Sequence, residues 1–180
     1  MHKLVVVING SGGVGKDTLC EIVGRHYNVL NVSSIDPIKK IALKNGWNGE
    51  KNEKTRKFLA DLKQLFVEFN DLPQKYLIDR YQEFLKDDKD ILFVHIREVN
   101  EIIKFKDNVG GECVTLLIRG RDSIKREWNN VADDDVEKYK YDYCYENNKS
   151  LEEVENDFLL FFEQILERRE YNEKSNIMFS

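Results

Sequence analysis

A run of apolar, mostly β-branched residues at positions 4–8 leads directly into the glycine-rich stretch 9–18, which reads NGSGGVGKDT. Such a run is typical of a strand buried on both faces of a parallel sheet. Glycines let the following backbone approach a ligand closely, and the N–H groups at the start of a helix attract phosphate oxygens. The order strand, glycine loop, helix therefore predicts a phosphate-binding loop in an α/β protein.

The glycine loop fits two phosphate-binding patterns. Gly10, Gly12 and Gly15 have the G-x-G-x-x-G spacing of a dinucleotide site, and Asp36 lies where that site needs a ribose-binding acid. Gly10, Gly15 and Lys16 instead match G-x-x-x-x-G-K, the P-loop that holds a triphosphate. We favour the P-loop because Lys16 can reach the β- and γ-phosphates, and a dinucleotide fold has no need of that lysine. A glycine turn without a ligand is the remaining alternative.

The predicted ligand is ATP with Mg²⁺. The residues expected to bind it are Gly10, Gly12, Gly13, Val14, Gly15, Lys16, Asp17 and Thr18. Asp17 stands where a Ser or Thr is usual, and its carboxylate would repel a triphosphate unless a cation lay between them. Because Mg²⁺ takes few protein ligands and keeps several waters, we expect Asp17 and Thr18 to hold it, Asp17 through a bound water. Asp17 could equally assist the incoming acceptor, or simply complement the positive end of the helix.

The rest of the chain alternates predicted strands with helices, which indicates an α/β fold with a five-stranded parallel sheet and right-handed crossovers. The further strands are expected at 28–32, 90–96, 113–118 and 141–145. Asp36 and Pro37 resemble a helix start, with Asp36 as N-cap, and a capping box at 150–153 opens the last helix. We expect a single domain over 1–170, a helical insertion at about 36–89, and a loose tail at 171–180.

Composition limits the classes of partner. The net charge of −5 does not favour nucleic acid or an anionic membrane. The three cysteines, Cys20, Cys113 and Cys144, form no C-x-x-C pair, so neither a zinc site nor a disulfide framework is indicated and a cytoplasmic protein is expected. No apolar run approaches the ~20 residues of a membrane span. A homodimer is left open.

Four segments carry a family resemblance. They are the GKDT of the loop, the DPIKK at 36–40, the HIREVNE at 95–101, and a late strand followed by Asn147 and an amphipathic helix. With these segments the chain resembles the phage-type deoxynucleoside monophosphate kinases and, more distantly, the animal-type phosphomevalonate kinases. The resemblance implies a P-loop NTPase fold with a helical acceptor-binding insertion, a short lid at about 119–137, and an acceptor site that includes Asp36 and Lys39.

The resemblance also implies that Arg97 faces the acceptor phosphate. Arginine offers a planar fork for phosphate oxygens, and the carboxyl end of a strand is where open α/β sheets bind ligands. The alternative is a surface ion pair with Glu98 or Glu101. His95 departs from the family, which has an aspartate there, and it can either form a hydrogen bond or pack as a core residue.

A basic segment follows the fourth predicted strand, where kinases of this shape have a lid. We expect Arg119 and Arg126 to bind substrate and Arg121 to act on the transferred phosphoryl group, although a solvated helix face is the alternative. The predicted catalytic residues are Lys16, Asp17, Arg97 and Arg121.

The function expected is ATP-dependent transfer of a phosphoryl group to a (deoxy)nucleoside monophosphate or a similar small phosphorylated acceptor. The partners are then these two small molecules, without nucleic acid or membrane. The alternatives are a nucleotide-binding protein without catalysis, which His95 favours, and a dinucleotide-binding oxidoreductase.

Overall fold

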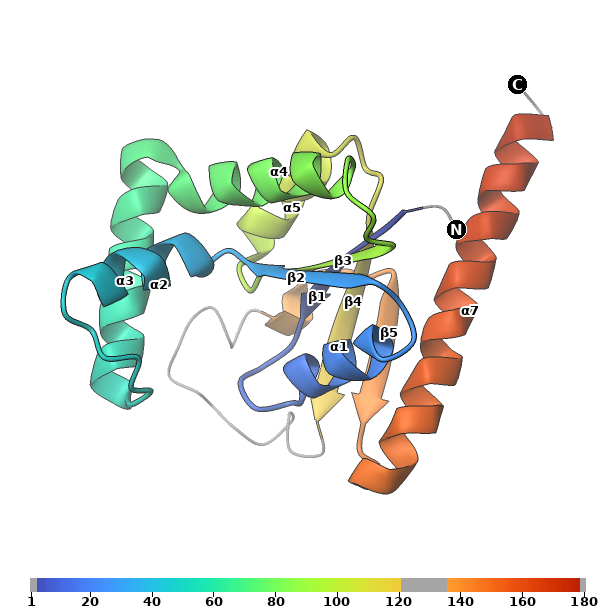
Figure 1. The fold of residues 1–180 in the computed structure, drawn as a ribbon, viewed down its shortest axis with the longest axis horizontal. Helices are drawn as coiled ribbons and strands as arrows, with labels where there is room; N and C mark the ends of the chain where they lie inside the picture. Colours follow the sequence, from blue (N-terminus) through green and yellow to red (C-terminus); the bar gives the residue numbers. More distant parts are fainter. Residues whose placement is uncertain (1–2, 121–135, 179–180) are drawn as a thin grey trace.

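A computed structural model describes residues 3–120 and 136–178 of the chain. Its centre is a sheet of five parallel strands in the order β2-β3-β1-β4-β5 (Figure 1). The strands are β1 (Leu4–Asn9), β2 (Val29–Ser33), β3 (Ile91–His95), β4 (Val114–Gly120) and β5 (Tyr143–Asn147). The prediction of a five-stranded parallel sheet is confirmed, with strand ends shifted by a few residues.

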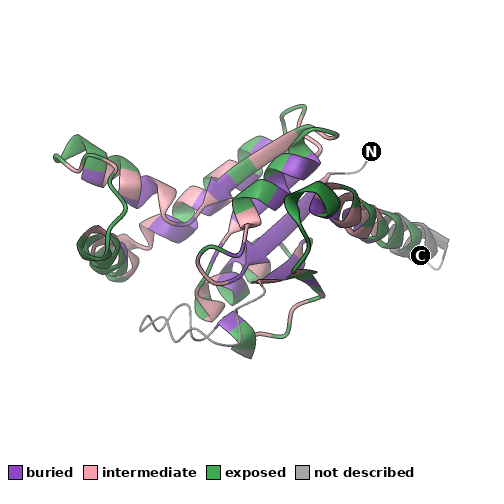
Figure 2. Ribbon diagram, turned by 90° about the horizontal axis from the view of Figure 1, so that it is seen from below, coloured by how far each residue is buried: buried purple, intermediate pink, exposed green. Residues whose placement is uncertain are grey.

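Helices cover both faces of the sheet, as the continuous apolar strands require. On one face, α1 (Lys16–Gly24) and α7 (Leu151–Met178) pack in a cluster that includes Val6, Phe93 and Phe158. On the other face, α4 (Leu72–Phe84) and α5 (Val99–Asn108) contribute to a cluster with Val7 and Val94. Neighbouring strand residues point to opposite faces, so β1 supplies both clusters. Figure 2 shows the resulting buried centre.

The crossover between β2 and β3 is helical and contains α2 (Asp36–Lys44), α3 (Glu53–Asn70) and α4. Helices α2 and α3 extend away from the sheet at one end of the molecule (Figures 1 and 2). The N-cap of α2 is Ile35, so the prediction of Asp36 as N-cap is wrong by one residue. The Asp36 carboxylate instead accepts a hydrogen bond from the backbone N–H of Ser33 at 2.7 Å, and this bond joins the end of β2 to α2.

Helix α7 continues to Met178, so most of the segment expected as a loose tail is helical. The chain contains no glycine or proline after Gly120. Once a helix has formed, each further residue adds a hydrogen bond, and elongation proceeds without an apolar face when no breaker intervenes. The lack of periodicity after position 170 was therefore no evidence against a helix. Among the described residues, no helix is both long enough and apolar enough to cross a bilayer.

Candidate functional site

The order of the strands produces a topological switch point, the place where open α/β sheets have a crevice, at the carboxyl ends of β1 and β3. These neighbouring strands lead to helices on opposite faces, β1 to α1 and β3 to α5. Open α/β sheets bind ligands at such a switch point. The register pairs Ile8 with His95, so the glycine loop and the 95–101 segment leave the sheet side by side.

The backbone of the glycine loop is fixed by close packing at Gly10 and Gly15. Both have positive φ, 149° and 89°. A Cβ on Gly10 would overlap the carbonyl oxygen of Ile118, and one on Gly15 would lie 2.6 Å from the Asn147 amide nitrogen. Gly12 has no atom within 4 Å of such a position, so this part of the loop faces open space. The loop is thus packed against β4 and β5 on one side and open on the other, which fits a phosphate cradle.

Lys16 lies across this loop. Its ammonium donates hydrogen bonds to the carbonyl oxygens of Gly10 and, at 2.9 Å, of Ser11. Lys16 is also the first residue of α1, where backbone N–H groups lack intrahelical acceptors and the helix dipole favours anions. A fixed positive charge and a helix N-terminus therefore meet at one point, as a triphosphate requires.

Asp17 and Thr18 lie exposed in the first turn of α1. One carboxylate and one hydroxyl suit Mg²⁺ that takes its other ligands from water and phosphate. They would not hold a metal alone, and the described residues contain no group of three or more His, Cys, Asp or Glu that could do so. Asp17 and Thr18 therefore fit a Mg²⁺ ion that binds together with ATP.

Asn9 organises the loop, and the sequence analysis did not single it out. It is fully buried, and its Oδ1 accepts a hydrogen bond from the Gly10 N–H at 2.8 Å. Its Nδ2 donates to the Arg97 carbonyl at 3.0 Å and to the Tyr141 hydroxyl at 2.8 Å. The available signal was an amide side chain at the end of an apolar strand, because a buried amide must be hydrogen-bonded. Asn147, at the end of β5, similarly donates to the Val14 carbonyl at 2.8 Å.

His95 lies where the loop meets the expected acceptor segment. It is half-buried, and its Nε2 lies 3.4 Å from Asn31 Oδ1 and 3.9 Å from Cys20 Sγ. Burial is the main reason that the pKa of His95 is lowered. Charged groups of the glycine loop and of the 36–40 segment also influence this pKa. Those groups are Asp17, Lys16, Asp36 and Lys39. The charges of four predicted site residues therefore act on this one histidine.

Arg97 is exposed just after β3, and Glu98 and Glu101 follow it. Both carboxylates bind the buried ammonium of Lys63 in α3, at 2.6 and 2.8 Å. Burial opposes ionisation of Glu98, but the Lys63 charge outweighs it and holds the Glu98 pKa below its usual range. Burial raises the pKa of Glu101. Sequence analysis missed Lys63 as a partner because 35 residues separate it from Glu98.

The lid residues are only partly described. Arg119 forms ion pairs with Glu137 and Glu146, and its Nε donates to both Glu137 carboxylate oxygens at 3.0 Å. Hydrogen bonds to Glu137 are the main reason that the Arg119 pKa is raised. Two carboxylates thus hold the guanidinium that was expected to bind substrate. Arg121 and Arg126, with most of the predicted lid, lie outside the described residues.

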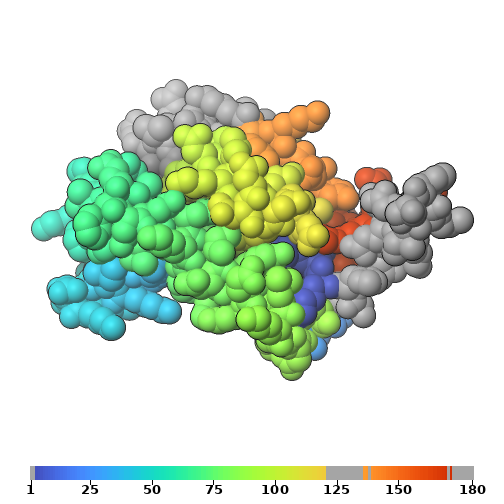
Figure 3. Space-filling model, turned by 90° about the horizontal axis from the view of Figure 1, so that it is seen from above, coloured from blue at the N-terminus to red at the C-terminus, as the bar shows by residue number. Residues whose placement is uncertain are grey.

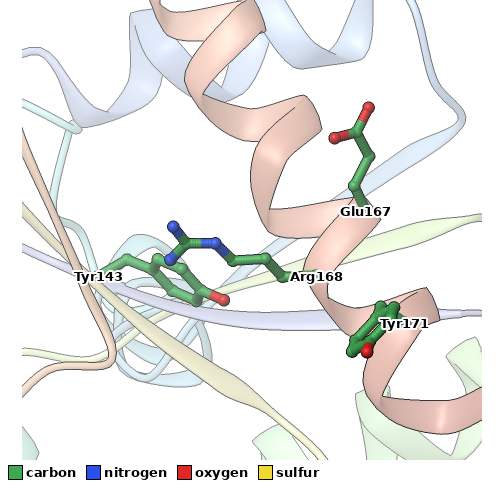
Figure 4. Close-up of a pocket in the computed structure, with 4 residues that line it drawn as sticks. All are labelled: Tyr143, Glu167, Arg168 and Tyr171. Atoms are coloured by element: carbon green, nitrogen blue, oxygen red, sulfur yellow. The ribbon is translucent and has the colours of Figure 1, made fainter. Parts of the chain in front are cut away.

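A hollow elsewhere on the surface is separate from the glycine loop. It measures about 560 Å³ and is lined by Tyr143, Glu167, Arg168 and Tyr171 (Figure 4). Tyr143 begins β5, whereas Asn147, which contacts the loop, ends it. The hollow therefore lies toward the amino-terminal end of β5, and the glycine loop lies at its carboxyl end.

The parallel sheet and the glycine loop that ends β1 define a P-loop α/β fold, as predicted. No protein-family model matches the chain, and no curated protein matches it.

Solved structures match almost the whole chain. Shikimate kinase from Aquifex aeolicus has a TM-score of 0.53 at 15% identity, covering 91% of this chain and 98% of its own. A gluconokinase from Sinorhizobium meliloti has a TM-score of 0.50 at 14% identity, covering 94% and 97%. TT1252 from Thermus thermophilus has a TM-score of 0.51 at 18% identity, covering 91% and 98%. At such identities the likeness shows the fold shared with these three proteins, two of which are named as kinases, and it leaves the acceptor undetermined.

Proposed function

We propose that the chain is an ATP- and Mg²⁺-dependent phosphotransferase whose acceptor is a (deoxy)nucleoside monophosphate or a similar small phosphorylated compound. The observation that carries the proposal is the glycine loop at the switch point, packed on one side, open on the other, and crossed by the Lys16 ammonium. The likeness to two structures named as kinases supports the reaction class. The resemblance of the 36–40 and 95–101 segments to the phage-type kinases supports the acceptor class.

In this proposal the residues of the chain act mainly by positioning and by neutralising charge. The loop N–H groups and Lys16 bind the β- and γ-phosphates, and Asp17 and Thr18 orient Mg²⁺ at the same helix end. Bound ATP·Mg²⁺ supplies the phosphoryl group and further positive charge. Arg97 binds the acceptor phosphate through two parallel hydrogen bonds, and Asp36 and Lys39 belong to the same acceptor site. Such alignment and charge stabilisation provide most of the catalysis in phosphoryl transfer.

His95 has a defined part in this arrangement. Because burial lowers its pKa, it is neutral near pH 7 and adds no charge between the two phosphates. A neutral imidazole can donate or accept one hydrogen bond at each ring nitrogen, and here Nε2 faces Asn31 Oδ1. We propose that His95 orders the crevice in place of the aspartate of the related kinases, while Lys16, Mg²⁺ and Arg97 carry the electrostatics.

The test is an ADP-formation assay with a panel of acceptors. The panel contains deoxynucleoside and ribonucleoside monophosphates and phosphorylated metabolites, with shikimate and gluconate as acceptors that carry no phosphate. We expect turnover with at least one phosphorylated acceptor, loss of turnover in Lys16→Ala, and full turnover in the exposed control Lys75→Ala. Turnover with shikimate or gluconate alone would refute the acceptor class. ATP binding without turnover on any acceptor would favour a non-catalytic nucleotide-binding protein.

A further inference from the structure

Much of the apolar surface of helix α3 is left uncovered by the rest of the described chain. Its large apolar residues are Phe58, Leu59, Leu62, Leu65, Phe66, Val67 and Phe69. None of them is buried, and Lys63 is the one buried residue of this fully described helix. Phe58, Leu65 and Phe69 are 43%, 63% and 81% exposed. Single exposed apolar residues are ordinary, but a contiguous set on one element indicates an interaction surface.

The three exposed residues and the half-buried Leu62 form one line along the helix. Phe58, Leu62, Leu65 and Phe69 follow one another at intervals of four, three and four residues, and we call this line the outer stripe. This is the spacing by which two helices pack together. Lys63 lies on a different row of the helix, about 100° around the axis from the outer stripe. This row faces the start of α5, where Lys63 forms ion pairs with Glu98 and Glu101. The outer stripe is therefore distinct from the row through which Lys63 reaches Glu98 and Glu101.

Charge is distributed unevenly along α3. The first turns carry Lys54, Arg56 and Lys57 against Glu53, whereas the last turns carry Glu68 as their exposed charge. The helix dipole adds positive charge to the first end and negative charge to the second. Asp61, near the middle, is already paired with Lys57 at 2.9 Å. A partner that is complementary to this helix must present an apolar stripe with the opposite charge gradient.

A second copy of α3 placed antiparallel meets both requirements. A two-fold axis near Leu62 and Leu65 would bring the basic end of each helix against the acidic end of the other, and it would cover both stripes. We infer that the outer stripe of α3 is where two copies of this chain pair. The position of α3 at one end of the molecule leaves it accessible to such a partner (Figures 1 and 3). One helix pair is a small interface, so the dimer is reversible.

Sedimentation analysis of the intact chain tests the pairing. We expect a species of twice 21.3 kDa that dissociates on dilution. Leu65→Glu and Phe69→Glu should each raise the dissociation constant by at least about tenfold, because a charge replaces a buried apolar side chain. The matched control is Leu160→Glu, which changes an equally exposed leucine on α7 (62%) and should leave the dimer intact. Circular dichroism establishes that each variant is folded.

Cross-linking tests the antiparallel arrangement. In a background with exposed Cys144 changed to serine, a short bis-maleimide linker should join little of Lys54→Cys alone, or of Glu68→Cys alone, into dimers. The two sites are 14 residues, or about 21 Å, apart along the helix. A mixture of the two variants should be joined readily by the linker, because the antiparallel pairing places position 54 of one copy nearer to position 68 of the other than either is to its own counterpart.

Three outcomes would overturn the inference. These are a chain that stays monomeric at every concentration, a dimer that persists in both charged variants, and self-linking of Lys54→Cys that exceeds the mixed product. Vesicle binding by a monomer, lost in Leu65→Glu, would assign the stripe to a membrane surface instead. None of these measurements depends on catalysis, so they stand apart from the proposed activity.

Discussion

The glycine loop and helix α3 are held in place by different kinds of contact. The loop is held by the amides of buried Asn9 and half-buried Asn147, which fix its two ends, and by backbone packed against backbone. Helix α3 is held by packing against α2 and α4 and by the buried Lys63 with its two carboxylates, while much of its apolar surface lies exposed. The difference indicates that specific close contacts fix the loop backbone, whereas α3 is held by its neighbouring helices and by one buried ion-pair cluster. Substitutions should therefore act locally and sharply in the loop, and more gradually in α3.

The largest effect on stability is expected from Gly10→Ala. The new Cβ would overlap the Ile118 carbonyl oxygen at a φ that alanine rarely adopts. We expect a loss of at least about 3 kcal/mol in the free energy of unfolding, measured by urea denaturation. The control Gly12→Ala, with open space around the new Cβ, should change it by less than about 0.5 kcal/mol. Equal losses in the two variants would show that the loop is not packed as described.

The next effect concerns Arg97 and is kinetic. If the guanidinium binds the acceptor phosphate, Arg97→Ala should lower kcat/KM for the acceptor by about a hundredfold. Arg97→Lys should cost almost as much, because lysine cannot reproduce a two-pronged contact. ATP affinity should change little in either variant. A parallel loss of ATP affinity would place Arg97 at the other substrate.

Two lysines of helix α3, one buried and one exposed, give a matched comparison of ion pairs. Lys63→Ala leaves two carboxylates facing each other in a buried site, and we expect a loss of about 2–3 kcal/mol in the free energy of unfolding. Lys57 pairs with Asp61 in the open, with side chains 77% and 61% exposed, so Lys57→Ala should cost less than about 0.5 kcal/mol. Similar losses for the two variants would contradict the role of Lys63 in holding α3.

The smallest effect is the pH dependence due to His95. Its pKa in the folded chain lies below the ordinary 6.5. Just below about pH 6.5, the histidine is therefore protonated more fully in the unfolded chain than in the folded chain. Stability contributed by the neutral imidazole is present above about pH 6.5 and is lost as the pH falls below it. Between about pH 7.5 and about pH 5.5, the wild type should lose up to roughly 1 kcal/mol more stability than His95→Gln. Parallel pH profiles would show that His95 titrates normally.

Local patterns were sufficient to predict the strands and the loop, because a buried parallel strand and a P-loop each leave a signal within a few consecutive residues. Contacts between distant residues left no such signal. The pairing of Lys63 with Glu98 and Glu101 depends on how α3 returns to the sheet, and that of Arg119 with Glu137 and Glu146 depends on the approach of β4 to β5. The exposure of the outer stripe was also unpredictable, since its apolar spacing is the same as that of a buried face.

The central claim, that the loop binds a triphosphate, is tested most directly by calorimetry with ATP and Mg²⁺. The wild type should bind ATP, and Lys16→Ala should weaken binding by at least about tenfold, because a charge-assisted contact to the β- and γ-phosphates is lost. Binding should weaken again when Mg²⁺ is removed, and NADH should not compete. Binding of NADH in place of ATP, with Lys16→Ala behaving as the wild type does, would contradict the account.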